Sequence, residues 1–256
     1  MTDPHDDEGT SSPRESLLEG RISVLAALRG RSRSVHAIYL ASDRDEQESV
    51  PIQRAAQAAG VTVIREERSE IDRRAQGSRH GGVLAMVGPR RFLSVDELLD
   101  TPGPSFTVMI DGVEDPYNFG SAVRSLYAAG VDGLVVRPRN WLSAAGIVAR
   151  ASAGASELLP IAVAETASDA AAACSPRGLT IACASRENAV SIYEADLTQP
   201  LFLLIGGEQR GITRSFLRQA DIRLHVPYAR GSAAELGTAA VAAVIGFEVM
   251  RQRSLL

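Results

Sequence analysis

Short apolar runs and helix-like spacings of apolar residues alternate along most of this chain. Runs such as 36–41 and 106–110 are typical of buried strands, and the segments after them place apolar residues every three or four positions, as amphipathic helices do. Strands that alternate with helices in this way predict an α/β fold with a mostly parallel or mixed sheet. The expected strands are 36–41, 61–64, 82–87, 106–110, 133–137, 158–163, 180–184, 201–205 and 222–226, and the expected helices are 17–30, 52–59, 69–76, 95–99, 121–129, 143–151, 168–174, 214–219 and 236–253.

Changes in composition divide the chain into four segments. Residues 1–15 are polar, acidic and contain proline, so they have no apolar surface to bury and we expect a disordered tail. Residues 16–89 predict a small α/β domain, 90–104 a linker with a short helix, and 105–256 a second α/β domain. The length of 256 residues is sufficient for two such domains.

A polar turn is expected between the strand 106–110 and the helix that follows it. The strand ends on Asp111, and Asn118 and Gly120 precede helical spacing that carries Arg124 in its first turns. Ligands of open α/β sheets bind at such places, because loop side chains and backbone N–H groups meet at the carboxyl ends of the strands. An ordinary strand–turn–helix connection with a surface arginine remains the alternative reading of this stretch alone.

Composition narrows the class of protein. Apolar residues make up 45% of the chain and charged residues 23%, which is typical of a soluble globular protein. No apolar run approaches the length of a membrane span and the N-terminus lacks the order of a signal peptide, so we expect a cytoplasmic protein without membrane contact. Cys174 and Cys183 lack metal-ligand spacing, so we expect two buried, reduced thiols and no metal site. The net charge of −4 argues against a uniformly basic surface but permits a local basic face.

Two further segments combine glycines with polar residues near the ends of strands. Strand 201–205 runs into Gly206 and Gly207, where backbone can approach a ligand without interference from a Cβ atom, and Glu208 adds a carboxylate. Farther along, Val226 and Pro227 end a strand and are followed by a loop rich in glycine and alanine and by the closing helix. Each segment is a weak signal alone, whereas their order and spacing together are specific.

With these segments in hand, the chain resembles the SpoU/TrmH family of RNA methyltransferases in the SPOUT superfamily. Asn118, Gly120 and Arg124 match its first motif, the segment 205–211 with Glu208 matches the second, and Val226-Pro227 begins the third. The stretch 152–155 followed by Glu157 is similar to the family's intervening SAGA-x-E stretch. The segments Glu19-Gly20-Arg21 and His80-Gly81-Gly82-Val83 are similar to the ribosomal-protein-like substrate-binding domain of members that modify ribosomal RNA.

This resemblance implies a fold, a cofactor and a reaction. The fold is an α/β SPOUT domain with a deep C-terminal trefoil knot, preceded by a small N-terminal α/β RNA-binding domain. The reaction is methyl transfer from S-adenosylmethionine, with 2′-O-ribose methylation of 23S ribosomal RNA as the preferred reading. A homodimer is implied, in which Arg124 of one protomer works at the cofactor site of the other. The cofactor-binding residues implied are Ile205, Gly206, Gly207, Val226, Pro227 and Leu236.

The resemblance also implies roles for polar residues. The family assigns activation of the ribose hydroxyl to the first-motif arginine, here Arg124, with Asn118 holding the loop and Glu208 orienting the arginine or the substrate. Because a guanidinium is almost always protonated, Arg124 would need an unusual site to act as a base, or would stabilise developing alkoxide charge. The residues expected to contact RNA are Arg21, Arg29, Arg31, Arg33 and His80.

The third motif departs from the family pattern of Ser-Leu-Asn-Val-Ser. Glu235 and Gly237 stand at the positions of the first serine and the asparagine, and Leu236 is retained. One hypothesis is that Glu235 pairs with Arg124 or serves as a carboxylate base. A second is that the protein methylates another acceptor, or binds RNA or cofactor without methylating. A third, of another class, is an RNA-binding or ribosome-associated module, for which the support is the N-terminal domain and the arginine cluster Arg29, Arg31 and Arg33.

Overall fold

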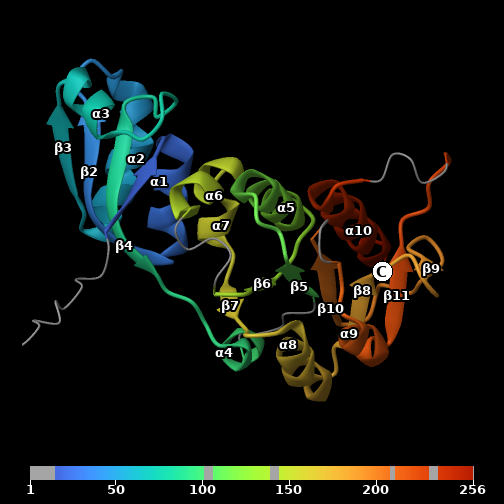
Figure 1. Cartoon of the computed structure of the whole chain (residues 1–256). Helices are drawn as coiled ribbons and strands as arrows, with labels where there is room; N and C mark the ends of the chain where they lie inside the picture. Colours follow the sequence, from blue (N-terminus) through green and yellow to red (C-terminus); the bar gives the residue numbers. More distant parts are fainter. Residues whose placement is uncertain (1–14, 101–105, 139–143, 208–210, 231–235, 256) are drawn as a thin grey trace, which may run out of the picture.

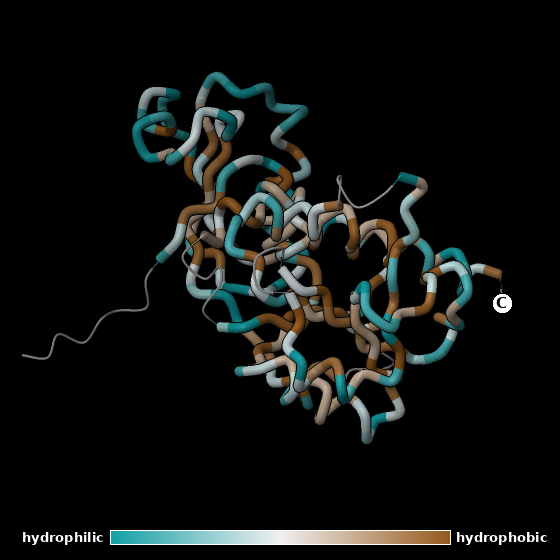
Figure 2. Tube along the Cα trace, turned by 45° about the vertical axis from the view of Figure 1, so that its right-hand side comes forward, coloured by the Kyte–Doolittle hydropathy of each residue, from teal (hydrophilic) through white to brown (hydrophobic). Residues whose placement is uncertain are grey.

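Two α/β domains, each built on its own sheet, make up the protein (Figure 1). The computed structural model describes residues 15–100, 106–138, 144–207, 211–230 and 236–255. The α/β class and the mixture of parallel and antiparallel pairing expected from the sequence are confirmed. Hydrophobic segments of the chain run through the strands of both sheets, and hydrophilic ones lie mostly on the outer loops (Figure 2).

The N-terminal domain has a four-stranded sheet in the order β1-β4-β2-β3. β2 and β3 are parallel, whereas β4 is antiparallel to both β1 and β2. Leu18, Ile38, Leu40 and Ile52 are fully buried in its core. The elements are β1 (Ser16–Glu19), α1 (Arg21–Gly30), β2 (Arg33–Ala41), α2 (Glu46–Ala59), β3 (Thr62–Glu66), α3 (Arg68–Arg74) and β4 (Val83–Arg90).

The first expected helix, 17–30, is wrong at its start. Residues Ser16–Glu19 form β1 and pair with β4, and the helix begins only at Arg21. Gly20 separates the two elements with a φ of 87°, a left-handed value that glycine tolerates and that interrupts a helix. The apolar pair Leu17-Leu18 fits a short strand as well as a helix, and pairing with β4 decides between them.

The second domain has a seven-stranded sheet in the order β7-β6-β5-β10-β8-β11-β9, in which every neighbouring pair is parallel. Its elements are α4 (Val95–Asp100), β5 (Phe106–Asp111), α5 (Pro116–Ala128), β6 (Gly133–Val136), α6 (Ala145–Ala151), α7 (Ala155–Leu158), β7 (Ile161–Val163), α8 (Ala167–Cys174), a 3-10 turn (Ser175–Arg177), β8 (Thr180–Ala184), β9 (Val190–Ser191), β10 (Leu201–Gly206), α9 (Arg214–Gln219), β11 (Ile222–His225) and α10 (Thr238–Arg253).

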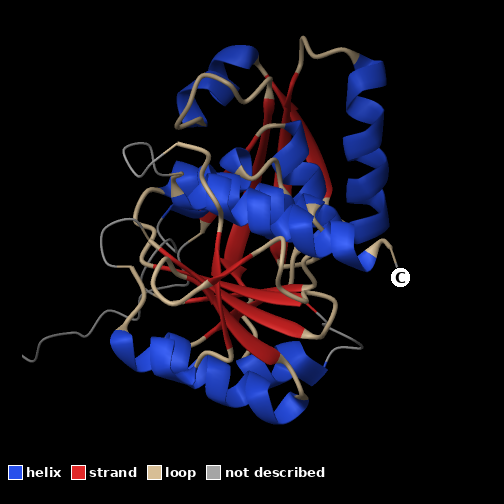
Figure 3. Cartoon of the chain, turned by 90° about the vertical axis from the view of Figure 1, so that its right-hand side faces the viewer, coloured by secondary structure: helices blue, strands red, loops and turns tan. Residues whose placement is uncertain are grey.

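Helices cover both faces of this sheet (Figure 3). α5 and α10 pack on one face, where Leu126 and Ile245 are fully buried in a core shared with the strands. α4, α8 and α9 pack on the other face, around Leu98 and Phe216. Gly246 of α10 allows close packing, because a Cβ atom there would lie 3.1 Å from the Cβ of Ala129 at the end of α5.

Part of the segment expected as a linker belongs to the second domain. Leu93 pairs with β7 through backbone hydrogen bonds to Ile161 and Val163, and α4 buries Leu98 against the sheet. The expected strand 158–163 is likewise shorter, since residues up to Leu158 form α7 and β7 begins at Ile161. These apolar positions pack against residues distant in sequence, so local spacing did not reveal their partners.

We expect both thiols to be inert in the folded protein. Burial raises the pKa of Cys174 to about 12, and burial also raises that of Cys183 to about 11 against the opposing effect of nearby Arg223. Since the thiolate is the reactive form, a thiol-specific reagent at pH 8 should label neither cysteine in native protein and both after denaturation. Mass spectrometry of the labelled protein gives the result, and labelling of native protein at either position would contradict it.

Candidate active site

A cavity of about 690 Å³ opens beyond the carboxyl ends of β8, β10 and β11, beside the start of α10. These strands are neighbours in the parallel sheet, so the loops that follow them meet at one edge. The cavity is lined by Ala184, Ser185, Arg186, Glu187, Ile205, Gly206, Gly207, Gly211, Ile212, Arg214, Leu217, Leu224, His225, Val226, Tyr228, Leu236, Gly237, Thr238, Val241 and Ile245.

The walls of this cavity combine apolar side chains with exposed backbone. Leu224 and Ile245 are fully buried behind it, while Tyr228 stands at its edge, where its hydroxyl accepts a hydrogen bond from the backbone N–H of Leu236 at 3.4 Å. The hydroxyl of Thr238 donates to the carbonyl of Gly206 at 3.4 Å, so α10 begins against the end of β10. Apolar walls with a few polar groups at fixed positions suit a small organic ligand.

Five of the residues expected to bind a cofactor line this cavity. They are Ile205, Gly206, Gly207, Val226 and Leu236, whereas Pro227 does not line it. Glu208 and Glu235, expected as catalytic, lie outside the described residues.

Sequence reasoning missed the loop after β8. Ser185, Arg186 and Glu187 line the cavity from this loop, although no motif marks them. A weak signal was present, because an apolar strand followed by polar residues in an α/β protein places those residues at the ligand-binding edge of the sheet.

Glycines at the end of β10 are required by the packing of the chain itself. The N–H of Gly207 donates to the carbonyl of Asp111 at 2.6 Å, and a Cβ atom on Gly207 would lie 2.0 Å from the carbonyl oxygen of Gly112. A Cβ atom on Gly206 would lie 2.9 Å from the backbone of Gly211. The sequence suggested that these glycines let a ligand approach, and the structure adds a backbone contact between β10 and β5 that tolerates no side chain.

The Asn-x-Gly segment is helical, and the expected polar turn is wrong. α5 begins at Pro116, and Asp115 caps it by accepting hydrogen bonds from the N–H groups of Tyr117 and Asn118, both at 3.2 Å. An Asp-Pro pair provides both an N-cap carboxylate and a favourable first helical residue, a signal that places the helix start five residues before Ser121. Asp115, not Asn118, therefore shapes this connection.

Gly120 serves close helix packing. A Cβ atom at this position would lie 2.6 Å from the Cβ of Ala151 and 3.1 Å from the backbone nitrogen of Ser152, at the end of α6. The glycine of this segment therefore lets α5 approach the α6–α7 connection closely.

Arg124 is exposed on α5 and does not line the cavity of its own chain. Asn118 is also exposed, but six residues of helix turn it roughly 120° around the axis from Arg124. The described part of one chain therefore brings neither residue to the cavity.

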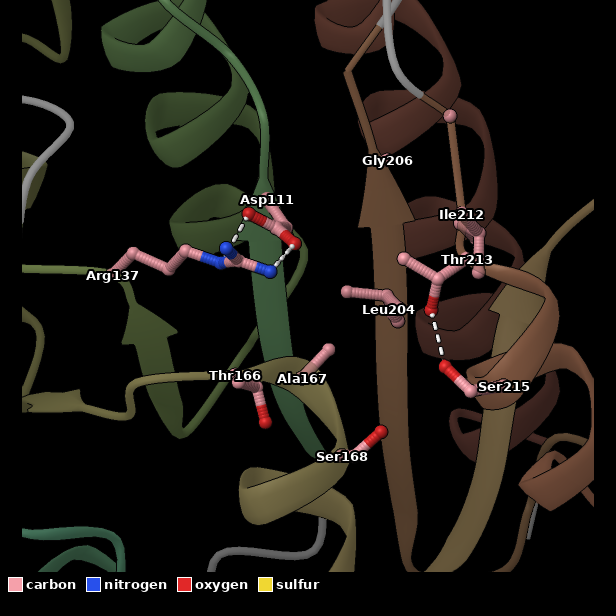
Figure 4. A pocket seen from close by; sticks show the side chains of 11 residues that line it. Asp111, Arg137, Thr166, Ala167, Ser168, Leu204, Gly206, Ile212, Thr213 and Ser215 are labelled. Carbon is pink, nitrogen blue, oxygen red and sulfur yellow. Dashed lines mark hydrogen bonds and ion pairs between the residues drawn. The ribbon is translucent and has the colours of Figure 1, made fainter.

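A smaller cavity of about 180 Å³ shares Gly206, Gly211 and Ile212 with the first (Figure 4). Arg137 after β6 points at Asp111 at the end of β5 and forms two contacts of 2.8 Å with its carboxylate. The hydroxyls of Thr213 and Ser215 lie 3.0 Å apart on the opposite wall. Since Asp111 already neutralises Arg137, the described residues that line this cavity do not offer a free cation.

The expected RNA-contacting residues separate into two groups. Arg21, Arg29 and Arg31 are exposed on or beside α1. Arg33 is buried with only 2% of its side chain exposed, and it donates to Glu157 of the second domain from Nε at 2.9 Å and from a terminal nitrogen at 3.0 Å. The expectation that Arg33 contacts RNA is therefore wrong, because its guanidinium is buried between the domains.

The expectation for His80 is also wrong. Its side chain is only 6% exposed, Nδ1 accepts a hydrogen bond from the N–H of Gly82 at 3.2 Å, and Nε2 lies 3.3 Å from Asp72. Gly82 itself has a φ of 74°. The ring thus stabilises the turn before β4, which is the turn role that the glycines beside it also indicate.

Neither a metal centre nor a membrane span is found within the described ranges. No group of three or more His, Cys, Asp or Glu side chains there is arranged to hold a metal ion. Among the same residues, no helix combines the length and the apolarity that crossing a bilayer requires.

Comparison with family models gives two matches that together span both domains. A model of the SpoU rRNA methylase family matches residues 105–245. A model described as RNA 2′-O ribose methyltransferase substrate binding matches residues 17–93.

Similar proteins align over nearly the whole chain. The 23S rRNA (guanosine-2′-O-)-methyltransferase RlmB of Ralstonia nicotianae is 31% identical over 244 residues, which are 94% of this chain and 98% of that protein. RlmB of Shewanella oneidensis is 28% identical, with 94% and 98% covered. An uncharacterized tRNA/rRNA methyltransferase of Mycobacterium ulcerans is 31% identical over 96% of this chain and 79% of its own length.

Solved structures share the fold over both domains. An rRNA methyltransferase from Sinorhizobium meliloti, solved with AdoMet bound, has a TM-score of 0.78 and 23% identity, and the match covers 95% of this chain and 88% of that one. The SpoU methyltransferase AviRb from Streptomyces viridochromogenes, in complex with the cofactor AdoMet, has a TM-score of 0.78 and 21% identity, with 94% and 92% covered.

Removing the carboxylate that caps α5 should destabilise the protein. Asp115→Ala leaves the N–H groups of Tyr117 and Asn118 without their acceptor, and we expect a decrease of about 1 kcal/mol in the free energy of unfolding. Chemical denaturation followed by circular dichroism measures it. Asp115→Ser, which keeps a capping oxygen, is the matched control, and equal stability of the alanine and serine variants would contradict the assignment of the cap.

Proposed function

We propose that this chain, which belongs to the SpoU rRNA methylase family, transfers a methyl group from S-adenosylmethionine to a ribose 2′-hydroxyl of 23S ribosomal RNA. The observation that carries the proposal is the cavity walled by the family's motif segments at Ile205–Gly207, Val226 and Leu236. The choice of 23S RNA is supported by relatives of that named activity, which align with both domains. An RNA substrate in turn supports a cytoplasmic location.

The cavity fits S-adenosylmethionine in size and lining. Its volume of about 690 Å³ lies within the range of roughly 300–1000 Å³ usual for small-molecule sites. Leu224, Val226 and Ile245 provide apolar surface for an adenine ring, and the backbone after Ile205 offers hydrogen-bonding groups. The bound cofactor supplies an electrophilic methyl group on its sulfonium sulfur.

Arg124 is the catalytic side chain of the proposal. An oxygen nucleophile must align with the methyl group and the sulfonium, so much of the catalysis is positioning. The ribose hydroxyl gives its proton to solvent, while the guanidinium of Arg124 donates hydrogen bonds to the ribose oxygen and stabilises its developing negative charge. Glu208 orients this arginine or the ribose, Asn118 lies in the first turn of the helix that carries Arg124, and Glu235 takes the place of the motif's serine.

A homodimer brings Arg124 to a cofactor site. Arg124 is exposed and lies away from its own cavity, so the arginine at each site comes from the partner protomer. Large exposed apolar side chains support a contact on this face, namely Tyr117 and Tyr127 of α5 and Phe247 and Met250 of α10. α5 and α10 lie side by side and form one surface (Figure 3).

The C-terminal segment forms the deep trefoil knot of the SPOUT superfamily in this proposal. Support comes from the insertion of β10 between β5 and β8, which places a late strand at the centre of the sheet. The segments around Gly206 and Leu236 then meet at one cavity.

Methyl incorporation tests the proposed function directly. Purified protein with radiolabelled S-adenosylmethionine and 23S RNA from cells lacking the gene should label the RNA at one ribose, located by mass spectrometry of nuclease fragments. Calorimetry with S-adenosylmethionine runs in parallel. Cofactor binding without incorporation into any RNA favours a binding protein, and absence of cofactor binding removes the enzyme proposal.

Arg124→Ala should abolish most turnover and leave cofactor binding intact. Removing a group that stabilises transition-state charge typically lowers kcat by about 100-fold to 1000-fold. Affinity for S-adenosylmethionine should stay close to the wild-type value, because the proposal places Arg124 of the partner protomer at the ribose oxygen and not among the residues that bind the cofactor. Arg124→Lys is the matched control, which keeps the charge but lacks the planar fork. Wild-type kcat in the alanine variant would refute the role.

Mixing two inactive variants tests the shared site. Val226→Arg fills the cavity but leaves Arg124 intact, whereas Arg124→Ala keeps the cavity. Co-refolded mixtures should recover part of the activity, because mixed dimers contain one site with both intact parts. No recovery in dimers confirmed by light scattering would contradict catalysis across protomers.

The exposed arginines of α1 should contribute to the salt dependence of RNA binding. Replacing Arg29 and Arg31 with glutamine should reduce the slope of log affinity against log salt by about one unit for each phosphate that an arginine no longer neutralises. Arg54→Gln together with Arg65→Gln, at two exposed positions of α2 and the edge strand β3, is the control for the same loss of total charge. Equal slopes for the double variant and the wild type would show that this face does not bind phosphate.

A further inference from the structure

α6 and α7 lie between the N-terminal domain and α5 (Figure 1). α7 and the turn before it belong to the SAGA-x-E stretch, to which the proposed reaction gives no task. The α1 helix of the N-terminal domain packs on α7, and Ala149 of α6 is fully buried in the core of the N-terminal domain. The N-terminal domain therefore packs on α7 and on α6.

A buried charged group, the interdomain cluster of Ser32, Arg33, Arg90 and Glu157, joins the two domains. Glu157 of α7 has only 1% of its side chain exposed. Its carboxylate accepts a hydrogen bond from the Ser32 hydroxyl at 2.6 Å and the two from Arg33, and it lies 3.5 Å from a terminal nitrogen of Arg90. These partners of the carboxylate all come from the N-terminal domain, so Glu157 is the second domain's contribution to the cluster.

Arg90 places a second cation against the same carboxylate. Its side chain is 4% exposed, and it also donates to the carbonyl of Leu159 at 2.9 Å. Burial lowers the pKa of Arg90 to about 10, with Glu157 opposing that shift and Arg33 adding to it. One carboxylate thus compensates two buried guanidinium groups, and removing it would leave both without their counter-ion.

The two domains approach too closely for additional side chains. A Cβ atom on Gly30, the last residue of α1, would lie 1.9 Å from the carbonyl oxygen of Glu157. A Cβ atom on Gly154, which has a φ of 83°, would lie 2.6 Å from the Cβ of Ala26. The close contacts at Gly30 and Gly154 therefore fix the position of α1 on α7. The hydrogen bonds of the interdomain cluster fix the orientation of the two domains.

A second ion pair holds the same orientation. Glu19, 6% exposed, receives a hydrogen bond of 2.7 Å from Arg150 of α6. The other oxygen of Glu19 accepts from the N–H groups of Gln76 and Gly77, in the loop before His80. Glu19 thus joins a loop of the N-terminal domain to the helix that Gly120 of α5 approaches.

We propose that Glu157 is a positioning residue for the RNA substrate, which fixes the N-terminal domain on α7 so that one ribose of the bound RNA reaches the catalytic centre. This inference rests on the proposed function. Contacts connect the RNA-binding surface to the catalytic side chain in three steps. In this proposal the exposed arginines of α1 bind RNA, and Glu157 fixes α1 on α7. Gly120 then allows α5, which carries Arg124, to pack closely on the α6–α7 connection. Without this contact between the domains, the RNA-binding arginines and the catalytic centre each remain intact, but their relative position no longer brings the ribose to the catalytic centre.

Two variants disrupt the docking in different ways. Glu157→Gln removes the charge that Arg33 and Arg90 share. Gly30→Ala keeps every charge but drives a methyl group into the backbone of α7, while alanine suits the helical backbone of α1 better than glycine. Ile52→Val, in the core of the N-terminal domain, lowers stability without touching the interface and is the control for destabilisation alone.

Hydrogen exchange without any substrate tests the docking. Amides of α1 and α7 should exchange at least tenfold faster in Glu157→Gln and Gly30→Ala than in the wild type, and Ile52→Val should leave α7 unchanged. Equal protection of α7 in the wild type and both docking variants would overturn the inference. This arm gives its answer even if the wild type transfers no methyl group, which would refute the proposed function instead.

Kinetics and site mapping test the positioning. Affinities for S-adenosylmethionine and for RNA should stay close to wild type in both docking variants, because neither cavity nor exposed arginines change. The kcat on 23S RNA should fall by about 100-fold, the effect expected when reacting groups are misplaced by an ångström. Methylation that remains should spread to neighbouring riboses, which a purely structural defect would not cause.

The outcomes are distinguishable. Methylation at a single ribose with a wild-type kcat in both docking variants overturns the inference. A decrease of activity in proportion to the decrease of stability, equal in Ile52→Val and the docking variants, also overturns it. If Glu157→Gln fails to fold, Gly30→Ala carries the same test alone.

Discussion

The contact between the ends of β10 and β5 is the constraint on which the cavity depends. Gly207 donates to Asp111 at 2.6 Å and faces the carbonyl of Gly112 without space for a Cβ atom. The backbones of β10 and β5 touch at this point, and the cavity lies beyond the carboxyl ends of β10 and of its neighbours β8 and β11. Gly237 and Thr238, at the start of α10, form a further wall of the cavity.

Close packing without side chains recurs where α5 meets its neighbours. Gly120 allows α5 to pack closely against the end of α6, and Gly246 allows α10 to pack closely against α5. These close approaches hold Arg124 on a rigid surface whose exposed side carries aromatic and aliphatic side chains. In the proposed enzyme, this close packing fixes the position of the helix that carries Arg124.

The N-terminal domain is attached by buried charge as well as by apolar packing. A buried ion pair adds little net stability, since desolvation of both groups opposes their attraction, but its geometry is directional. The pairing of Glu157 with Arg33 and Arg90 therefore defines an orientation between the domains that apolar contacts alone would leave less specific. In the proposed enzyme this orientation links RNA recognition to the reacting ribose.

The sequence by itself determined the alternation of strands and helices, the division into two α/β units and five of the residues that line the cavity, namely Ile205, Gly206, Gly207, Val226 and Leu236. These features follow from local periodicity and from short motifs, so β8 (Thr180–Ala184) and α9 (Arg214–Gln219) match their expected bounds. Only the tertiary structure decided that Arg33 is buried rather than facing RNA, because its partner Glu157 lies 124 positions away. It also decided that the loop at 185–187 lines the cavity and that Gly120 serves helix packing. Such contacts join segments that are distant in sequence, so the local pattern of one segment does not reveal its partner.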